Sequence, residues 1–181
     1  MAGLEIPSQL GKTTVVTGAT GGLGYETALA LAKAGSEVIL TGRDDQKGQS
    51  AVEKISREVI GAKLSYEHLD LANLASVADF ARRMHARQSL DLLINNAGVM
   101  ALPRRQTTAD GFEMQFGTNH LGHFALTARL MPLLRRASGA RVVSLSSLAH
   151  RTGRIDFNDL QGWIHPVRRQ FLKRSLDDVI C

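Results

Sequence analysis

The sequence predicts an α/β fold in which about five parallel strands form a doubly wound sheet. Short apolar runs alternate with helix-like stretches along most of the chain, the pattern that consecutive βαβ units produce. A glycine-rich turn, residues 17–24, separates the first apolar run from the first helix. The chain has 181 residues, 44% hydrophobic and 22% charged, which suits one globular domain and excludes a disordered chain.

The candidate strands are five short apolar runs. The first, residues 13–17, is β-branched throughout, as expected for a strand that is buried on both faces. The other four runs cover residues 37–40, 64–69, 92–94 and 141–145. A long stretch follows each of the first four runs, so each connection can return the chain parallel to the strand before it, with the right-handed sense that such crossovers adopt.

Four helices are predicted between these strands. The first covers residues 25–34 and the second residues 44–59. Asn73 caps the third, in which apolar residues recur at the spacing of one helix face. The fourth and longest helix is predicted over residues 110–131.

The glycine-rich turn reads Thr-Gly-Ala-Thr-Gly-Gly-Leu-Gly from Thr17 to Gly24. Its place between a strand and a helix favours the binding of a pyrophosphate, because a helix N-terminus offers unpaired N–H groups and the positive end of its dipole. Glycine also permits a positive φ and a close approach of the backbone to a ligand. A plain glycine-rich turn without a ligand is the alternative interpretation.

With this turn the sequence resembles the short-chain dehydrogenase/reductases, in which the motif is Thr-Gly-x-x-x-Gly-x-Gly. Further motifs of that family match in order, after the third strand, after the fourth strand and in the long helix: Asp70-Leu71, Asn95-Asn96-Ala97-Gly98 and Asn119. The fifth strand then runs into Ser146-Ser147. The residues around Asn119, together with 146–150 and 153–155, are similar to the retinol-dehydrogenase-like and WW-domain-oxidoreductase-like branch. The resemblance implies a Rossmann-type NAD(P)-binding domain over residues 1–162, with a sheet that is incomplete on its C-terminal side, and a divergent tail over 163–181.

The resemblance implies that a nicotinamide dinucleotide is a partner of the chain. The turn would surround the pyrophosphate, the pair after the third strand would meet the adenine, and the loop after the fourth strand would line the floor beneath the nicotinamide ribose. The cofactor-binding residues so implied are Thr17, Gly18, Thr20, Gly21, Gly22, Leu23, Gly24, Asp70, Leu71, Asn96, Ala97 and Gly98. From the residues alone, that loop is also interpretable as a turn that ends a strand, since Asn and Gly favour turns.

The end of the second strand bears on the choice between NAD and NADP. A carboxylate there would bond the ribose 2′-OH of NAD and repel a 2′-phosphate. The sequence places Arg43 just after the strand and Lys47 one helical turn further on, and arginine can bind a phosphate through two parallel hydrogen bonds. We therefore expect NADP to be preferred over NAD. Asp44 and Asp45 oppose this preference unless they cap the next helix, and a surface role is the alternative for Arg43.

The resemblance also implies hydride transfer between the nicotinamide and the carbon of a small lipophilic alcohol or carbonyl compound. This chemistry needs a proton donor and a polar cradle for the developing alkoxide. Ser147 matches the family serine that polarises the carbonyl oxygen, with Ser146 as the alternative, and Asn119 matches the asparagine of the proton relay. A strand-end serine and a packed helical asparagine are the structural alternatives.

The family's catalytic tyrosine, with its lysine four residues later, has no match in these residues. Both tyrosines of the chain, Tyr25 and Tyr66, precede the motifs of the catalytic half. We therefore expect impaired activity or none. A non-catalytic dinucleotide-binding module and a non-functional gene fragment are the alternatives.

Similarity to the family stops near Gly162, where we expect a frameshift, a premature stop or an alternative exon. Loss of the following helix would leave the fifth strand as a sheet edge, and it would either expose apolar residues of the long helix or leave the tail to cover them. Those residues are Phe124, Leu126, Leu130 and Leu133. In this family the two helices form the subunit interface, so the resemblance also implies a homo-oligomer through the helix that contains Asn119.

Charge and composition argue against other function classes. The net charge is +5, but the arginines are scattered in pairs and the chain has only six Phe, two Tyr and one Trp, so no nucleic-acid partner is expected. The six histidines show no metal-ligand spacing and the single cysteine is Cys181, so no metal site is expected. No apolar run predicts a membrane span and no signal peptide is recognisable, so we expect a cytoplasmic protein.

Overall fold

The sheet is parallel throughout and has the strand order β3-β2-β1-β4-β5. The structure is a computed structural model that describes residues 6–151 and 156–161. Its strands are β1 (Thr13–Val16), β2 (Glu37–Gly42), β3 (Leu64–His68), β4 (Leu92–Asn95) and β5 (Arg141–Ser144). Each differs from its predicted range by one or two residues, so the predicted doubly wound sheet is confirmed. The predicted tail, 163–181, and the motif residues 153–155 lie outside the described residues.

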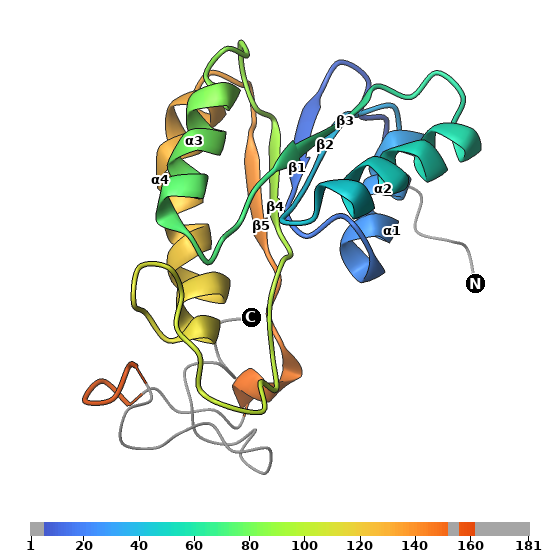
Figure 1. Cartoon of the computed structure of the whole chain (residues 1–181). Coiled ribbons are helices and arrows are strands. Elements are labelled where there is room, and N and C mark those ends of the chain that lie inside the picture. Colours follow the sequence, from blue (N-terminus) through green and yellow to red (C-terminus); the bar gives the residue numbers. More distant parts are fainter. Residues whose placement is uncertain (1–5, 152–155, 162–181) are drawn as a thin grey trace.

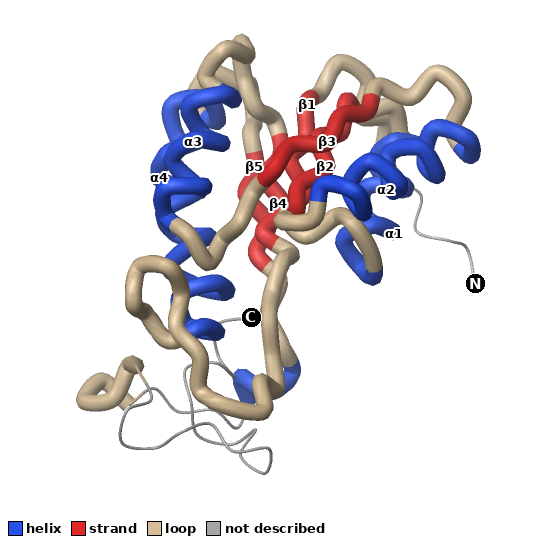
Figure 2. Tube along the Cα trace, viewed as in Figure 1, coloured by secondary structure: helices blue, strands red, loops and turns tan. Residues whose placement is uncertain are grey.

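Helices cover both faces of the sheet (Figure 1). One face carries α1 (Gly22–Lys33) and α2 (Asp45–Glu58), and the other carries α3 (Leu74–Met84) and α4 (His123–Leu134), with the strands between the two layers (Figure 2). The chain adds β2 and β3 on one side of β1, then returns to place β4 and β5 on its other side. The strand order therefore reverses between β1 and β4, and ligands of such sheets bind beyond the carboxyl ends of the strands at this point.

Side-chain caps set where α2 and α3 begin. The Asp44 carboxylate accepts a hydrogen bond from the Lys47 N–H at 3.0 Å. Asn73 Oδ1 accepts bonds from the N–H groups of Ala75, at 2.9 Å, and Ser76, at 3.3 Å, as the sequence predicts. Each cap satisfies N–H groups that have no partner within the helix.

The long fourth helix begins later than predicted and contains a π-helical segment, η1 (Phe116–Gly122), before α4. The predicted start at Asp110 is wrong because the Asp110 carboxylate accepts a bond from the Leu74 N–H, at 2.9 Å, and so serves the start of α3 instead. Glu113 forms an isolated bridge with Thr107, and its carboxylate accepts a bond from the Phe116 N–H at 2.7 Å. Glu113 therefore supports the first turn that the chain does form.

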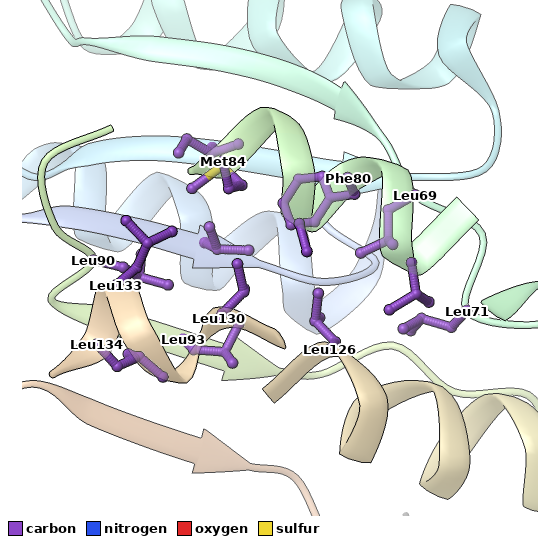
Figure 3. Packing of buried hydrophobic residues seen from close by; sticks show 14 residues of the cluster. Leu69, Leu71, Phe80, Met84, Leu90, Leu93, Leu126, Leu130, Leu133 and Leu134 are labelled. Atoms are coloured by element: carbon purple, nitrogen blue, oxygen red, sulfur yellow. The ribbon is translucent and has the colours of Figure 1, made fainter. Parts of the chain in front are cut away.

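Two apolar clusters lie on the two faces of the sheet. One fills the space between the sheet and the α3/α4 layer and contains Phe80, Met84, Leu126, Leu130 and Leu133 (Figure 3). The other lies under α1 and α2 and contains the opposite-facing strand residues Val16, Val38 and Leu40 together with Ile55. Within the described residues, no helix is long and apolar enough to cross a membrane.

The expected exposure of the long helix is wrong for three of its four residues. The leucines Leu126, Leu130 and Leu133 are fully buried because they face the sheet and α3, and only Phe124 is exposed, at 68%. The expected sheet edge is confirmed, since within the described residues β5 pairs with β4 alone. The side chains of Val142 and Val143 on β5 are also exposed.

This packing predicts unequal effects for two substitutions in one helix. Leu130→Ala should lower the free energy of unfolding by about 2–5 kcal/mol, because it leaves a cavity among fully buried side chains. Phe124→Ala, at an exposed position of the same helix, should change it by about 0.5 kcal/mol or less. Urea unfolding followed by circular dichroism measures both, and equal losses would contradict the packing described.

Candidate functional site

The glycine-rich turn, residues 17–24, leads from β1 into the first turn of α1 at the carboxyl edge of the sheet. We call it the phosphate turn after its predicted ligand. Gly18 and Gly22 have φ values of +64° and +55°, which favour glycine. Gly21 precedes α1 with extended backbone, and no side chain of the described residues caps the helix there. Because α2 and α3 do carry such caps, α1 is distinguished by N–H groups that remain available to an anion.

The phosphate turn packs tightly against residues 95–98, the last residue of β4 and the loop after it. We call these residues the floor loop after their predicted place beneath the nicotinamide ribose. A Cβ atom on Gly24 would overlap Asn96 Nδ2 and the Gly18 carbonyl oxygen. A Cβ atom on Gly18 would lie 3.0 Å from the Cα and Cβ atoms of Ala97. Glycine at these positions is therefore required by the contact between the turn and the loop.

Thr17 holds the two segments together through hydrogen bonds. Its fully buried Oγ1 atom accepts bonds from the N–H groups of Asn96 and Ala97, each at 2.9 Å. The Asn96 side chain forms a second link between the segments, because its Nδ2 atom donates a hydrogen bond to the Thr17 carbonyl oxygen at 2.8 Å. Both residues are thus supports that set the position of the floor loop relative to the phosphate turn.

Asn119 braces the chain just beyond the floor loop. It lies in η1 and is buried, with its Oδ1 atom accepting from the Val99 N–H at 2.8 Å. Its Nδ2 atom donates to the Val99 carbonyl oxygen at 2.9 Å. A Cβ atom on Gly98 would lie 3.5 Å from Asn119 Oδ1, so this residue pair is in close contact as well.

The strand register brings the predicted serine to the same edge of the sheet. Ser144 on β5 pairs with Asn95 on β4, and the Leu145 N–H donates to the Asn95 carbonyl oxygen at 3.0 Å. Ser147 lies three residues after Ser144, the last residue of β5, and is half-buried. It therefore lies at the carboxyl end of β5, as the floor loop lies at that of β4.

Asp70 and Leu71, the two residues after β3 that are predicted to contact the adenine, lie in different environments. The Asp70 carboxylate accepts a bond from the Ala72 N–H at 2.9 Å and the residue is half-buried at the sheet edge. The Leu71 side chain is 5% exposed and belongs to the core under α3 and α4 (Figure 3). Asp70 is thus the member of the pair whose side chain remains at the edge.

The two acidic residues after Arg43 both have partners within the protein. Asp44 caps α2, and Asp45 Oδ1 lies 3.0 Å from the Tyr66 hydroxyl and 2.8 Å from His68 Nδ1. These hydrogen bonds from His68 and Tyr66 lower the pKa of Asp45. Arg43 itself is exposed beside the phosphate turn, where a Cβ atom on the preceding Gly42 would lie 2.7 Å from Thr20 Cγ2.

Three supporting residues were missed in the sequence: Tyr66, His68 and His123. Tyr66 and His68 are two positions apart on β3, so their side chains lie on the same face of the sheet. This alternation was the signal in the sequence that the two side chains could act together. The third is buried, with Nε2 2.9 Å from Thr17 Oγ1 and Nδ1 2.8 Å from the Asn119 carbonyl oxygen. Nothing in a single sequence indicates that this histidine meets a threonine more than a hundred residues earlier.

Comparison with protein families and curated proteins agrees with this geometry. The sequence model of the family described as short chain dehydrogenase matches residues 12–158. Human retinol dehydrogenase 13 is 50% identical over 151 residues, which cover 83% of this chain and 45% of the relative. Polyprenol dehydrogenase of Danio rerio is 44% identical over 163 residues, which cover 87% of this chain and 50% of the relative. The chain spans about half the length of these curated relatives.

Solved structures show the same fold. An uncharacterised protein from Mycobacterium paratuberculosis superposes with a TM-score of 0.79 at 43% identity, covering 93% of this chain and 58% of that one. A short chain dehydrogenase from Escherichia coli CFT073, complexed with NADPH, superposes with a TM-score of 0.71 at 28% identity, covering 83% of this chain and 63% of that one.

The tight contact at Gly24 predicts that a single methyl group is harmful there. Gly24→Ala should lower the free energy of unfolding by about 1–3 kcal/mol, the usual cost of overpacking, because the new Cβ overlaps backbone and Asn96. Gly21→Ala is the matched control, since its backbone is extended and no atom lies within 4 Å of the added Cβ. Thermal unfolding of both variants without ligand checks the prediction, which fails if Gly21→Ala is the more damaging change.

Burial of His123 predicts acid sensitivity. Burial lowers the pKa of His123 below the ordinary value of about 6.5, so the unfolded chain binds the proton more readily than the folded chain does. The free energy of unfolding should therefore be largest above about pH 6.5 and should fall as the pH drops from there toward the lowered pKa. Urea unfolding from pH 8 to pH 5 should show a shallower decline in His123→Gln, and identical pH profiles would contradict this assignment.

Proposed function

Since the chain belongs to the short-chain dehydrogenase family, we propose that its phosphate turn, Arg43, Asp70 and floor loop bind NADP(H). The activity we propose is that of an oxidoreductase acting between an alcohol and a carbonyl group. The observation that carries the proposal is the uncapped N-terminus of α1 at a glycine turn with no room for a Cβ at Gly24. The free N–H groups suit the negative charge of a pyrophosphate. The close contact at Gly24 leaves no space for any residue larger than glycine at that position.

The residues present fit a nicotinamide dinucleotide. When bound, the cofactor supplies or takes up a hydride. The N–H groups of the first turn of α1 would bind its phosphates. The floor loop, which Thr17 and Asn96 hold in place by hydrogen bonds, would contact its nicotinamide end. Ser147, at the carboxyl end of β5, is the hydroxyl that we propose to donate a hydrogen bond to the substrate oxygen.

The partners of the acidic residues support a preference for NADP. Asp44 is engaged by the N-terminus of α2, and Asp45 by Tyr66 and His68. Neither carboxylate therefore needs a ribose hydroxyl as its partner. The Arg43 guanidinium beside them is the group that we propose to bind the 2′-phosphate.

The substrate that we propose is a small lipophilic alcohol or the matching carbonyl compound. The names of two relatives, retinol dehydrogenase and polyprenol dehydrogenase, support the lipophilic character of this substrate. The cytoplasmic location, the homo-oligomer and the domain limits 1–162 stay predictions.

A second candidate is a dinucleotide-binding module without turnover. The observation that favours it is the placement of the two tyrosines, because Tyr25 lies in α1 and Tyr66 lies on β3 with its hydroxyl 2.7 Å from the Gly42 carbonyl oxygen. Neither stands at the carboxyl end of β5, where Ser147 lies. Loss of the general acid lowers the rate by about 10²–10⁴-fold relative to an enzyme that has it. The module would be identified by NADPH binding together with retinal reduction that is slower than that of an intact relative by this factor or more.

Calorimetric titration with NADPH and NADH at two salt concentrations tests cofactor binding. We expect saturable binding that persists at the higher salt, with NADPH bound more tightly. Arg43→Ala should weaken NADPH binding about tenfold or more, because a hydrogen bond to a charged group contributes about 1.5–3 kcal/mol. NADH binding should change little.

Arg57→Ala is the control for loss of one positive charge. Arg57 is exposed in the last turn of α2, at the opposite end of that helix from Arg43. It should leave the affinity for both cofactors unchanged. Absence of saturable NADPH binding to the wild-type chain would overturn the proposed function, and equal effects of both arginine variants would overturn the role of Arg43.

A further inference from the structure

The Thr17 hydroxyl meets four polar groups at the point where the end of β1, the end of β4 with the floor loop, and the start of α4 converge. Besides the N–H groups of Asn96 and Ala97, it lies 2.9 Å from His123 Nε2 and 3.3 Å from the Ile94 carbonyl oxygen. A hydroxyl has one proton to donate and two lone pairs that accept. The two N–H groups occupy both lone pairs, so the proton must go to the histidine or to the carbonyl.

The histidine is the better acceptor. Its Nδ1 atom lies 2.8 Å from the Asn119 carbonyl oxygen, which can only accept, so Nδ1 carries a proton. The neutral ring then has a lone pair on Nε2, directed at Thr17. The 2.9 Å distance to Nε2 is shorter than the 3.3 Å to the Ile94 oxygen, and hydroxyl bonds weaken with length.

The imidazole therefore closes a chain of contacts around the proposed cofactor floor. It joins Thr17, which holds the floor loop, to Asn119, which holds Val99 just beyond that loop. Without the ring, the nearest acceptor for the hydroxyl proton is the Ile94 oxygen. Rotation of the hydroxyl toward it would turn the lone pairs away from the two N–H groups.

We propose that His123 is a positioning residue, which accepts the hydroxyl proton of Thr17 and thereby fixes the floor loop against the phosphate turn. The role rests on the proposed function, because the floor loop matters only if a dinucleotide binds there. His123 does not touch the ligand in this assignment. It acts through Thr17 and through the backbone of η1.

Two amide substitutions separate this role from simple packing. The side-chain oxygen of glutamine reaches the position of Nε2, whereas that of asparagine reaches only as far as Nδ1. His123→Gln should therefore keep the NADPH dissociation constant within about twofold of wild type, and His123→Asn should raise it about tenfold, the factor that one hydrogen bond of about 1.4 kcal/mol represents. Calorimetry with the full 181-residue chain measures both.

His85→Asn is the matched control. The exposed His85 ring makes the same local contact, with Nδ1 2.7 Å from the Ala81 carbonyl oxygen four residues earlier, but no hydroxyl of the described residues bonds to its other nitrogen. Its substitution should leave NADPH binding unchanged. Equal binding by the Gln and Asn variants of His123, or equal weakening of both, would overturn the positioning role.

A measurement on the wild-type chain keeps the inference testable if either variant fails to fold. Nitrogen-15 NMR at pH 7.5 should show His123 with the proton on Nδ1 and a hydrogen-bonded lone pair on Nε2. A proton on Nε2 would overturn the assignment. If wild type shows this tautomer but binds no NADPH, the proposed function fails while the Thr17–His123 bond stands.

Discussion

The reversal of strand order between β1 and β4 is the constraint on which the site depends. Because β2 and β4 flank β1 on opposite sides, the chains leaving β1 and β4 diverge to opposite layers of helices. Their carboxyl ends must nevertheless meet, and they meet through Thr17, Asn96 and the glycines of the phosphate turn. The tight packing there follows from the topology: two backbones that run side by side in the sheet are still in contact where they separate.

Much of this arrangement could be predicted from the sequence because it rests on local patterns. The five strands follow from short apolar runs, and the caps Asp44 and Asn73 follow from residue type and position. The phosphate turn combines a glycine pattern with a strand before it and a helix after it. In each case the information lies within a few consecutive residues.

The errors arose where distant residues decide the outcome. Asp110 looked like the start of a helix, yet its carboxylate bonds to the first turn of another helix. Leu126, Leu130 and Leu133 were expected to be exposed because a subunit interface was inferred for that helix, and α3 covers them instead. From the sequence, His123 was noted only for its lack of metal-ligand spacing, and its contact with Thr17 is visible only in the fold. No periodicity or spacing encodes such encounters, since each joins elements that are far apart in the chain.

The uncapped N-terminus of α1 has a thermodynamic consequence for the folded state as a whole. A helix end without a cap leaves N–H groups that water must solvate, and an anion that replaces that water is bound by the native chain and not by the unfolded one. Binding energy is then added directly to the stability of the fold, by about 2.7 kcal/mol when the free ligand is at a hundred times its dissociation constant. For the dinucleotide proposed here, this linkage would make the resistance of the chain to heat and proteases rise with the concentration of the ligand.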